Sequence, residues 1–209
     1  MAPPDPSARQ IVYRAIITIL TKIVFMGIDD EKQSPTVNDK SAEAILPNRF
    51  PDWKTVTIGG YQNAEQYKRT ASQTGCHIGD WASDILESPN FIVTQEKEQI
   101  VLAIVTVAEL GLTKGGSYHN ICTNASKFGM QLCPAEIGPA LRLAYKEQPD
   151  GEAVAVAMKA VQTRSGGLYI FTLGRNGENL WLRGSFGHRN FFWYPDQKFV
   201  FARLSSAAQ

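Results

Sequence analysis

The chain has 209 residues, of which 44% are hydrophobic and 20% are charged, and its formal net charge is +1. This composition excludes a disordered or fibrous chain, and the length suffices for one hydrophobic core with an appendage. The near-neutral charge gives no overall attraction for nucleic acid or anionic lipid, so such binding would need a local patch. Three cysteines are too few for a secreted disulfide framework, which favours a reducing cytoplasm.

The N-terminal segment, residues 1–52, is predicted to hold an amphipathic helix followed by a linker. Residues 15–26 are apolar, but they are shorter than the roughly 20 residues of a membrane span and include Lys22. We therefore predict no transmembrane segment. Apolar residues recur at helical spacing within residues 7–26, and this helix must dock on the body, on a partner or on a membrane surface. The globular domain is predicted to comprise residues 53–209.

The first part of that domain predicts alternating strands and helices. Its strands are rich in β-branched residues, and the run from Gln99 to Val107 is nearly all apolar, which is typical of a central strand covered on both faces. Gly129 stands where a helix C-terminal glycine belongs. The predicted elements are strands at 53–58, 91–94 and 99–107, and helices at 64–72, 79–86 and 117–128.

From Leu141 onward the hydrophobic pattern changes to a period of two, with Leu141, Leu143 and Tyr145 alternating with other residues. Turn signals follow at Pro149-Asp150-Gly151 and at Asn176-Gly177. Short strands with closely spaced turns predict an antiparallel meander. The predicted fold class is therefore α+β, with N-terminal mixed strands and helices packed on a C-terminal antiparallel β-meander.

A metal site is the first chemical possibility, because His119 and Cys122 are three residues apart on a predicted helix and Cys133 follows soon after. No Cys-x-x-Cys pair is present, and a closed zinc site needs four ligands at tight spacing. Scattered Cys and His residues are more often core and surface residues. We predict no metal and no cofactor.

A thiol nucleophile is the second possibility, and its centre would be Cys133. This residue precedes Pro134, which can open a short helix whose positive end lowers a thiol pKa. Glu136, His119 or His188 could assist as a base, which gives the candidate catalytic groups of an enzyme of unknown class. The alternative, which we favour, is that Cys133 is a packed residue at the end of a segment, because no local catalytic signature surrounds it.

The C-terminal stretch from 175 to 203 interleaves aromatic rings with cations and contains few acidic residues. Aromatic faces can stack on a ligand and cations can hold its anionic groups. The alternative is core filling, since every second residue of a strand points inward. The patch has too little charge for a strong nucleic-acid signal. The predicted ligand-binding residues are Trp181, Arg183, Arg189, Trp193 and Tyr194.

The run from Leu132 to Leu143, LCPAEIGPALRL, carries a resemblance to a family. Together with Gly151-Glu152, Trp181-Leu182 and Phe199-Val200-Phe201, it resembles a group of uncharacterised bacterial proteins over roughly residues 53–203. That family has no assigned activity, so the resemblance implies no catalytic residues. Within the run, Glu136 and Arg142 have opposite charges, and we expect them to pair across the corner between helix and strand.

Three functions follow from these patterns. The first is a non-enzymatic cytoplasmic binding or accessory module that uses the aromatic-rich C-terminal surface to bind a protein or a small polar ligand. The second is an enzyme of unknown class with a site near Cys133 and Glu136. The third is a protein tethered to a membrane surface or a partner through the helix at 7–26.

Overall fold

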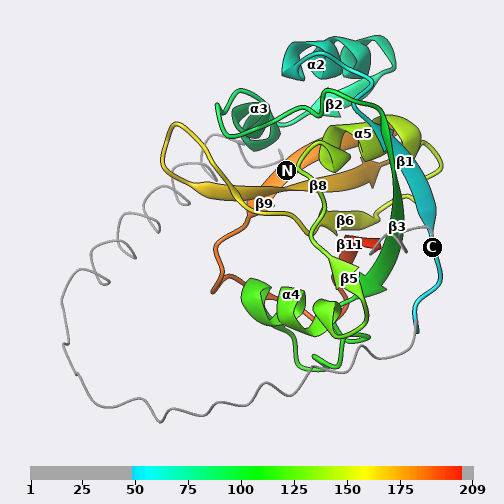
Figure 1. Ribbon diagram of the computed structural model, residues 1–209, viewed down its shortest axis with the longest axis vertical. Coiled ribbons are helices and arrows are strands. Elements are labelled where there is room, and N and C mark those ends of the chain that lie inside the picture. The colour runs from blue at the N-terminus through cyan, green and yellow to red at the C-terminus, as the bar shows by residue number, and fades with distance from the viewer. Residues whose placement is uncertain (1–48, 204–209) are drawn as a thin grey trace, which may run out of the picture. The chain divides into compact units, whose positions relative to one another are not determined.

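The computed structural model describes residues 49–203, and the predicted helix at 7–26 lies outside this range (Figure 1). Within it the chain forms four helices, a nine-stranded sheet and a two-stranded sheet, which confirms the α+β class. No helix of this part combines the length and the hydrophobicity that a membrane crossing requires. Phe50 is already buried and packs edge-on against the ring of Phe128, with the centroids 5.2 Å apart.

The predicted helices and most of the predicted strands of the first part occur close to their expected positions. The expected strand at 91–94 is absent, and this segment has no regular structure. The helices are α2 (Ala64–Gln73), α3 (Asp80–Leu86), α4 (Tyr118–Ser126) and α5 (Ile137–Ala144). The strands are β1 (Lys54–Ile58), β2 (Cys76–Ile78), β3 (Glu98–Thr106), β4 (Gly116–Ser117), β5 (Met130–Gln131), β6 (Ala153–Val156), β7 (Val161–Gln162), β8 (Leu168–Asn176), β9 (Asn179–Phe186), β10 (Phe192–Trp193) and β11 (Lys198–Arg203).

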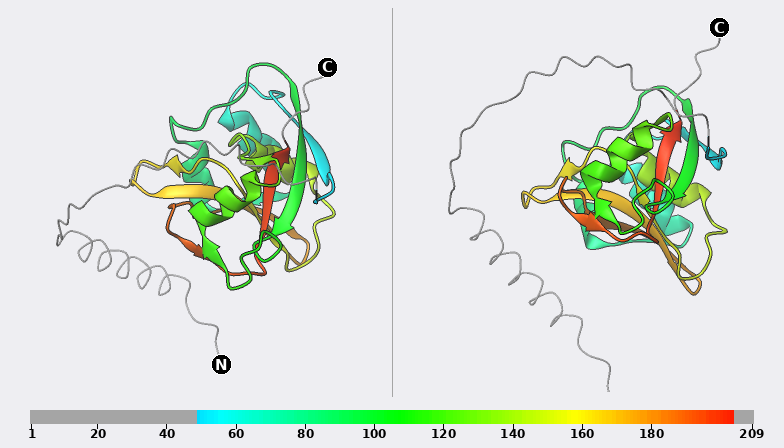
Figure 2. Two further views of the ribbon diagram at one scale, coloured as in Figure 1. Left: turned by 60° about the horizontal axis from the view of Figure 1, so that its bottom comes forward. Right: turned by 90° about the horizontal axis from the view of Figure 1, so that it is seen from below.

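The large sheet is mixed, so the predicted antiparallel meander is wrong in its topology. The strand order is β1-β3-β11-β6-β8-β9-β2, with β5 also paired to β11 and β7 to β8. β11 pairs antiparallel with β3 and parallel with β6, and both views in Figure 2 show the red β11 beside the green β3. β2 is parallel to β9. The hairpin of β8 and β9 is as predicted, with Gly177 at φ +59° in its turn.

The sheet is strongly curled into a half-barrel, and α5 lies on its concave side (Figure 1). This helix contacts β1 at one end of the strand order and β8 and β9 near the other end. One short helix can reach strands so far apart in the order only if the sheet wraps around it. α2 packs on β2 and α5, while α3 packs on β8 and β9.

The prediction of a strand beginning at Leu141 is wrong, because residues 137–144 form the helix α5. Ile137, Leu141 and even Arg142 are buried, so this helix is enclosed on most sides and lacks the polar face that would have shown a helical period. Pro139 lies in the first turn of α5, where a missing N–H costs little. The sheet resumes at β6, beyond the predicted turn at Gly151, which has φ +76°.

Gly138 allows α5 to approach the sheet closely. A Cβ at this position would lie 2.2 Å from Cδ2 and 2.8 Å from Cβ of Phe171, a fully buried residue of β8. We expect Gly138→Ala to lower the free energy of unfolding by about 2 kcal/mol, although alanine is the better helix former, because overpacking costs about 1–3 kcal/mol. Urea denaturation is the measurement. Gly60→Ala, where a Cβ would meet nothing within 4 Å, is the matched control, and an equal effect of the two would contradict this packing.

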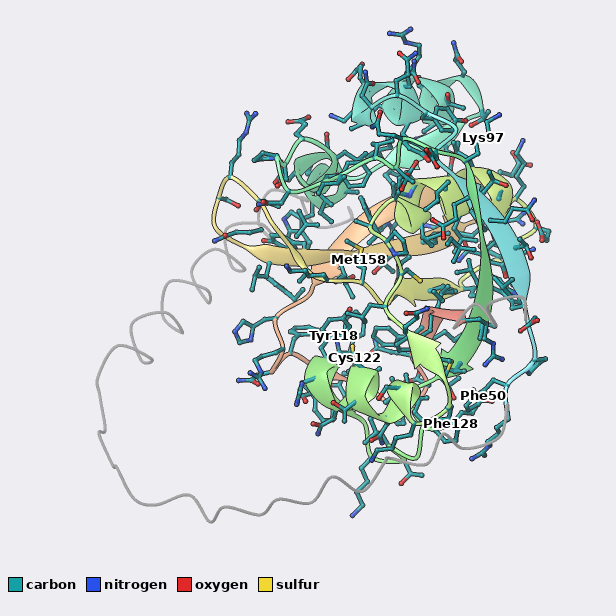
Figure 3. All side chains as sticks on the ribbon, viewed as in Figure 1. Phe50, Lys97, Tyr118, Cys122, Phe128 and Met158 are labelled. Atoms are coloured by element: carbon teal, nitrogen blue, oxygen red, sulfur yellow. The ribbon has the colours of Figure 1, made fainter. Side chains whose placement is uncertain are left out.

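The convex side of the sheet carries a second layer of core under α4. Leu102 and Ala103, successive residues of β3 that point to opposite faces, are both buried, which confirms that the middle of this strand is covered on both sides. Figure 3 shows Tyr118 and Cys122 on the side of α4 toward Met158. The Tyr118 hydroxyl donates to the carbonyl of Met158 (2.6 Å) and accepts from its N–H (2.8 Å), so it pairs the backbone just after β6 ends.

Candidate functional site

A run of aromatic rings begins on α3 and continues along the end of the β8–β9 hairpin that lies opposite its turn. Trp81 contacts the rings of Tyr169 (5.1 Å between centroids) and Phe186 (5.3 Å). Gly184 of β9 permits this, since a Cβ there would lie 2.6 Å from that of Trp81. The Trp81 side chain is 37% exposed.

The same run continues through the segment after β9 into the core beneath α4. Phe186 contacts Phe191 (5.3 Å), Phe191 contacts Trp193 (5.5 Å), and Trp193 contacts the buried Phe199 (4.8 Å). Each partly exposed ring therefore rests on a more deeply buried one. Such edge-to-face and tilted ring pairs add about 0.5–1.5 kcal/mol each beyond the buried area, which holds the exposed rings in place.

The N-terminus of α4 positions the loop that carries these rings. The N–H of Tyr118 donates to the carbonyl of Phe191 and that of His119 to the carbonyl of Arg189, both at 2.9 Å. The first N–H groups of a helix have no partner within the helix, so the loop satisfies them. Within the loop, the N–H of Phe191 donates to the carbonyl of His188 at 2.8 Å.

Phe192 and Tyr194 extend the exposed aromatic surface on β10 and beyond. Their rings contact edge-on at 5.7 Å, and they are 50% and 65% exposed. Gly115 makes room for the Phe192 ring: its φ is +84°, and a Cβ there would lie 2.6 Å from Cζ of that ring. We call the exposed and half-exposed rings of this region the aromatic patch; its members are Trp81, Phe186, Phe191, Phe192 and Tyr194.

The structure divides the predicted ligand-binding residues between two places. Arg189 and Tyr194 are exposed in and beside the aromatic patch, while Trp193 is 4% exposed, serves as its support, and leaves Nε1 without a hydrogen-bond partner among the described residues. Trp181 and Arg183 lie near the other end of β9. At about 3.3 Å per residue, Trp181 is roughly 17 Å along the strand from Phe186.

The candidate catalytic residues do not meet in one place. Cys133 is buried, its thiol contacts the Val200 carbonyl at 3.7 Å, and burial raises the pKa of the thiol far above its ordinary value. Glu136 is bonded to other residues, as described below. His119 is exposed at the N-terminus of α4, and His188 is exposed in the loop after β9. Within residues 49–203 no hydrogen bond joins any two of these four side chains.

The thiols of the partly buried Cys122 and the buried Cys133 are expected to be unreactive in the native protein. Burial raises the pKa of Cys122 to about 11 and that of Cys133 further, so the nucleophilic thiolate is scarce near neutral pH. With a thiol reagent at neutral pH we expect Cys122 and Cys133 to react at least about a hundredfold more slowly in the native protein than in denaturant. Alkylation with mass-spectrometric mapping measures this. Rapid native labelling of Cys133 would instead favour the thiol-enzyme alternative.

Glu136 and Arg142 are both buried at opposite ends of α5, and the predicted pairing between them does not occur. Oε1 of Glu136 accepts from the Tyr67 hydroxyl (2.7 Å) and the Gly59 N–H (3.0 Å), and Oε2 accepts from the Thr94 N–H (2.7 Å). Glu136 lies at the positive N-terminal end of the α5 dipole, and Arg142 lies near its negative C-terminal end. Each end of the dipole therefore favours the opposite charge of the side chain beside it.

Arg142 has its own set of acceptors. Its guanidinium donates to Oε1 of Gln148 and to the carbonyls of Tyr145 and Gly174. Burial lowers its pKa, yet an arginine starts so high that it stays charged near neutral pH. Its Nε lacks a partner among the described residues. Glu136 and Arg142 are thus internal ties between segments, held by neutral partners.

No cluster of three or more potential metal ligands occurs within residues 49–203. No family model, no curated protein and no solved structure matches this chain. The site therefore has to be argued from its own geometry. Sequence reasoning missed Trp81 and did not select Phe186, Phe191 or Phe192, although the density of rings from 181 to 194 was the signal that led to the region.

Proposed function

We propose that the protein is a binding module whose aromatic patch docks an apolar segment of a partner polypeptide. The observation that carries this proposal is the combination of exposure and support: Phe191, Phe192 and Tyr194 are 38–65% exposed while their loop is fixed by the helix α4 and by buried rings. Exposed aromatic side chains on a fixed backbone are typical of interaction sites.

The chemistry of the patch favours a polypeptide over a sugar or a nucleic acid. Protein interfaces are rich in aromatic residues and poor in charge at their centre, with a polar rim. Three of the five members are phenylalanines, which offer no hydrogen bonds to sugar hydroxyls, and only Arg189 and His188 border them in the loop. A nucleic-acid groove would need several more cations to hold phosphates.

The neighbouring rings that hold the aromatic patch in place also affect its affinity for a partner. Ordering rotamer-rich side chains on binding costs about 0.5–1.5 kcal/mol each, and rings already held by their neighbours avoid much of that cost. A rigid set of aromatic side chains can therefore bind tightly through few residues. The three cysteines are free thiols, which supports a reducing compartment such as the cytoplasm for this interaction.

Peptides selected against the protein by phage display test this proposal. We expect most selected peptides to bind the patch, and Phe192→Ala to weaken them by roughly 30-fold, the effect of losing one hot-spot ring worth about 2 kcal/mol. Ile92→Ala is the matched control, because Ile92 is equally apolar and 75% exposed but makes no ring contact with the patch. Isothermal titration calorimetry measures both. Equal affinities of the two variants would refute the assignment.

A further inference from the structure

Exposed basic residues gather beside the Phe191 and Phe192 end of the aromatic patch, around the start of α4. We call these residues the basic rim; they are Lys114, His119, His188 and Arg189. The segments that carry them, residues 110–128 and 186–195, contain no Asp or Glu. Because the whole chain has a formal net charge of only +1, this excess of basic residues is local.

Backbone contacts bring the members of the basic rim together around the rings. The N–H of His119 donates to the carbonyl of Arg189 at 2.9 Å, which joins the start of α4 to the loop. A Cβ at Gly115 would lie 2.6 Å from Cζ of Phe192, so the backbone of Lys114, one residue earlier, is close to that ring. The basic residues therefore border the rings from both segments.

The basic rim has no acidic counterpart in its own surroundings. Within residues 49–203 none of its members forms an ion pair. The nearest acidic residues along the chain are Asp196 and Glu109, whose carboxylate accepts from Thr106 at 2.7 Å. His188 accepts through Nδ1 from the N–H of Asn190 at 3.3 Å, so the neutral ring carries its hydrogen on Nε2 and can donate it to a carboxylate.

The other end of the aromatic patch has the opposite charge. On α3, Trp81 lies between Asp80 and Asp84, which are both exposed. Burial and the nearby Asp84 raise the pKa of Tyr169, whose ring contacts that of Trp81. An anionic membrane or a nucleic acid would place negative charge against both ends, and the acidic end opposes this. A polypeptide segment can instead confine its acidic residues to one end.

We infer that the partner segment carries acidic residues next to its apolar residues, at the end that lies over the basic rim. This inference rests on the proposed docking of a polypeptide at the aromatic patch and names the class of segment that docks. Complementary charge at a rim mainly raises the association rate and its salt dependence, whereas the loss of a hot-spot ring mainly raises the dissociation rate. The inference and the proposed function therefore predict different kinetic effects.

Peptides selected against the full-length protein from an unbiased phage-displayed library are the probe. We expect Asp and Glu to be enriched beside their apolar residues. One selected peptide is then synthesised with either Glu or Lys flanking its apolar residues. At low ionic strength we expect the Glu form to bind roughly tenfold more tightly, because each exposed ion pair contributes modestly. In about 1 M salt, where the Debye length is about 3 Å, the two affinities should converge.

Two charge-reversed proteins make the result specific. Lys114→Glu with Arg189→Glu should slow the association of the Glu form by roughly tenfold and reverse the preference for it. Arg69→Glu with Lys97→Glu has the same net charge and is the matched control. Arg69 and Lys97 are exposed, Figure 1 shows α2, which carries Arg69, at the opposite end of the domain from α4, and Figure 3 shows Lys97 there as well. Surface plasmon resonance gives both rate constants.

The outcomes separate this inference from the proposed function. If Phe192→Ala weakens both peptide forms but the unchanged protein binds them equally, or if the two charge-reversed proteins behave alike, the inference is wrong and docking at the aromatic patch stands. If Phe192→Ala changes neither form, the proposed function fails as well. Tighter binding of phosphatidylserine vesicles or of an oligodeoxynucleotide than of the Glu form would also overturn the inference.

Discussion

Replacing Glu136 by alanine is expected to lower the free energy of unfolding by about 3–5 kcal/mol. The change would leave the Tyr67 hydroxyl and the N–H groups of Gly59 and Thr94 without their acceptor. These donors come from α2, from the end of β1 and from the segment before β3, so one carboxylate ties three parts of the fold to the start of α5. Urea denaturation followed by tryptophan fluorescence gives the value.

Two smaller changes give reference values for the loss of stability in Glu136→Ala. Tyr67→Phe removes one of the three donors and should cost about 1 kcal/mol. Glu136→Gln keeps one acceptor oxygen but turns an NH2 group toward a donor, so its cost should fall between the other two. If Glu136→Ala costs no more than Tyr67→Phe, the carboxylate does not hold these segments together.

Arg142→Met is expected to cost about 3 kcal/mol, the second large effect. Methionine retains an apolar stem of similar length but leaves the side-chain oxygen of Gln148 and the carbonyls of Tyr145 and Gly174 without their donor. Arg175→Met is the control: this half-buried arginine donates to the carbonyls of Gln148 and Gly177, and its loss should cost about 1 kcal/mol. Equal costs for the two variants would contradict the role of Arg142.

A double-mutant cycle distinguishes these separate networks from the ion pair expected from sequence. Because Glu136 and Arg142 have no partner in common, the effects of Glu136→Gln and Arg142→Met should add within about 0.5 kcal/mol. A coupling energy well above 1 kcal/mol would show that the two charges act as a pair after all.

The sequence predicted the fold class and most individual elements, and it failed where packing rather than local pattern decides. The alternation of Leu141, Leu143 and Tyr145 indicated a strand, but these residues belong to the helix α5 or follow it directly. In the structure α5 is enclosed by strands on both sides and by α2, so Arg142 is buried with the rest. A helix buried nearly all round loses the period by which a sequence reveals it.

The strand order could not be predicted from the sequence, because most strand pairings are not specified by a local signal. A turn such as Asn176-Gly177 specifies that β8 and β9 pair, because the signal is local. Nothing local specifies that β11 inserts between β3 and β6, or that β2 joins the far edge beside β9. Those choices depend on burying both faces of β11, whose Phe199, Val200 and Phe201 are all enclosed.

The sequence predicted the region of the candidate site but not which of its rings are exposed. The high density of aromatic residues indicated the region. The exposure of each ring, however, depends on the side chains that pack against it in the fold. Trp193 is buried because it lies between Phe191 and Phe199, and Trp81 is exposed because it rests on Phe186 at the rim of the hairpin. A sequence without coordinates cannot rank these rings by exposure.

Site-specific photo-crosslinking in the cells that make the protein tests the proposed recognition surface most directly. A benzoylphenylalanine at position 192 reports on the aromatic patch, and one at position 97 is the control, since Figure 3 places Lys97 on the opposite side of the domain from α4. We predict one discrete adduct with another protein from position 192, lost when Phe191 and Tyr194 are both changed to serine, and none from position 97. Equal adducts from both positions, or none from position 192, would contradict the account.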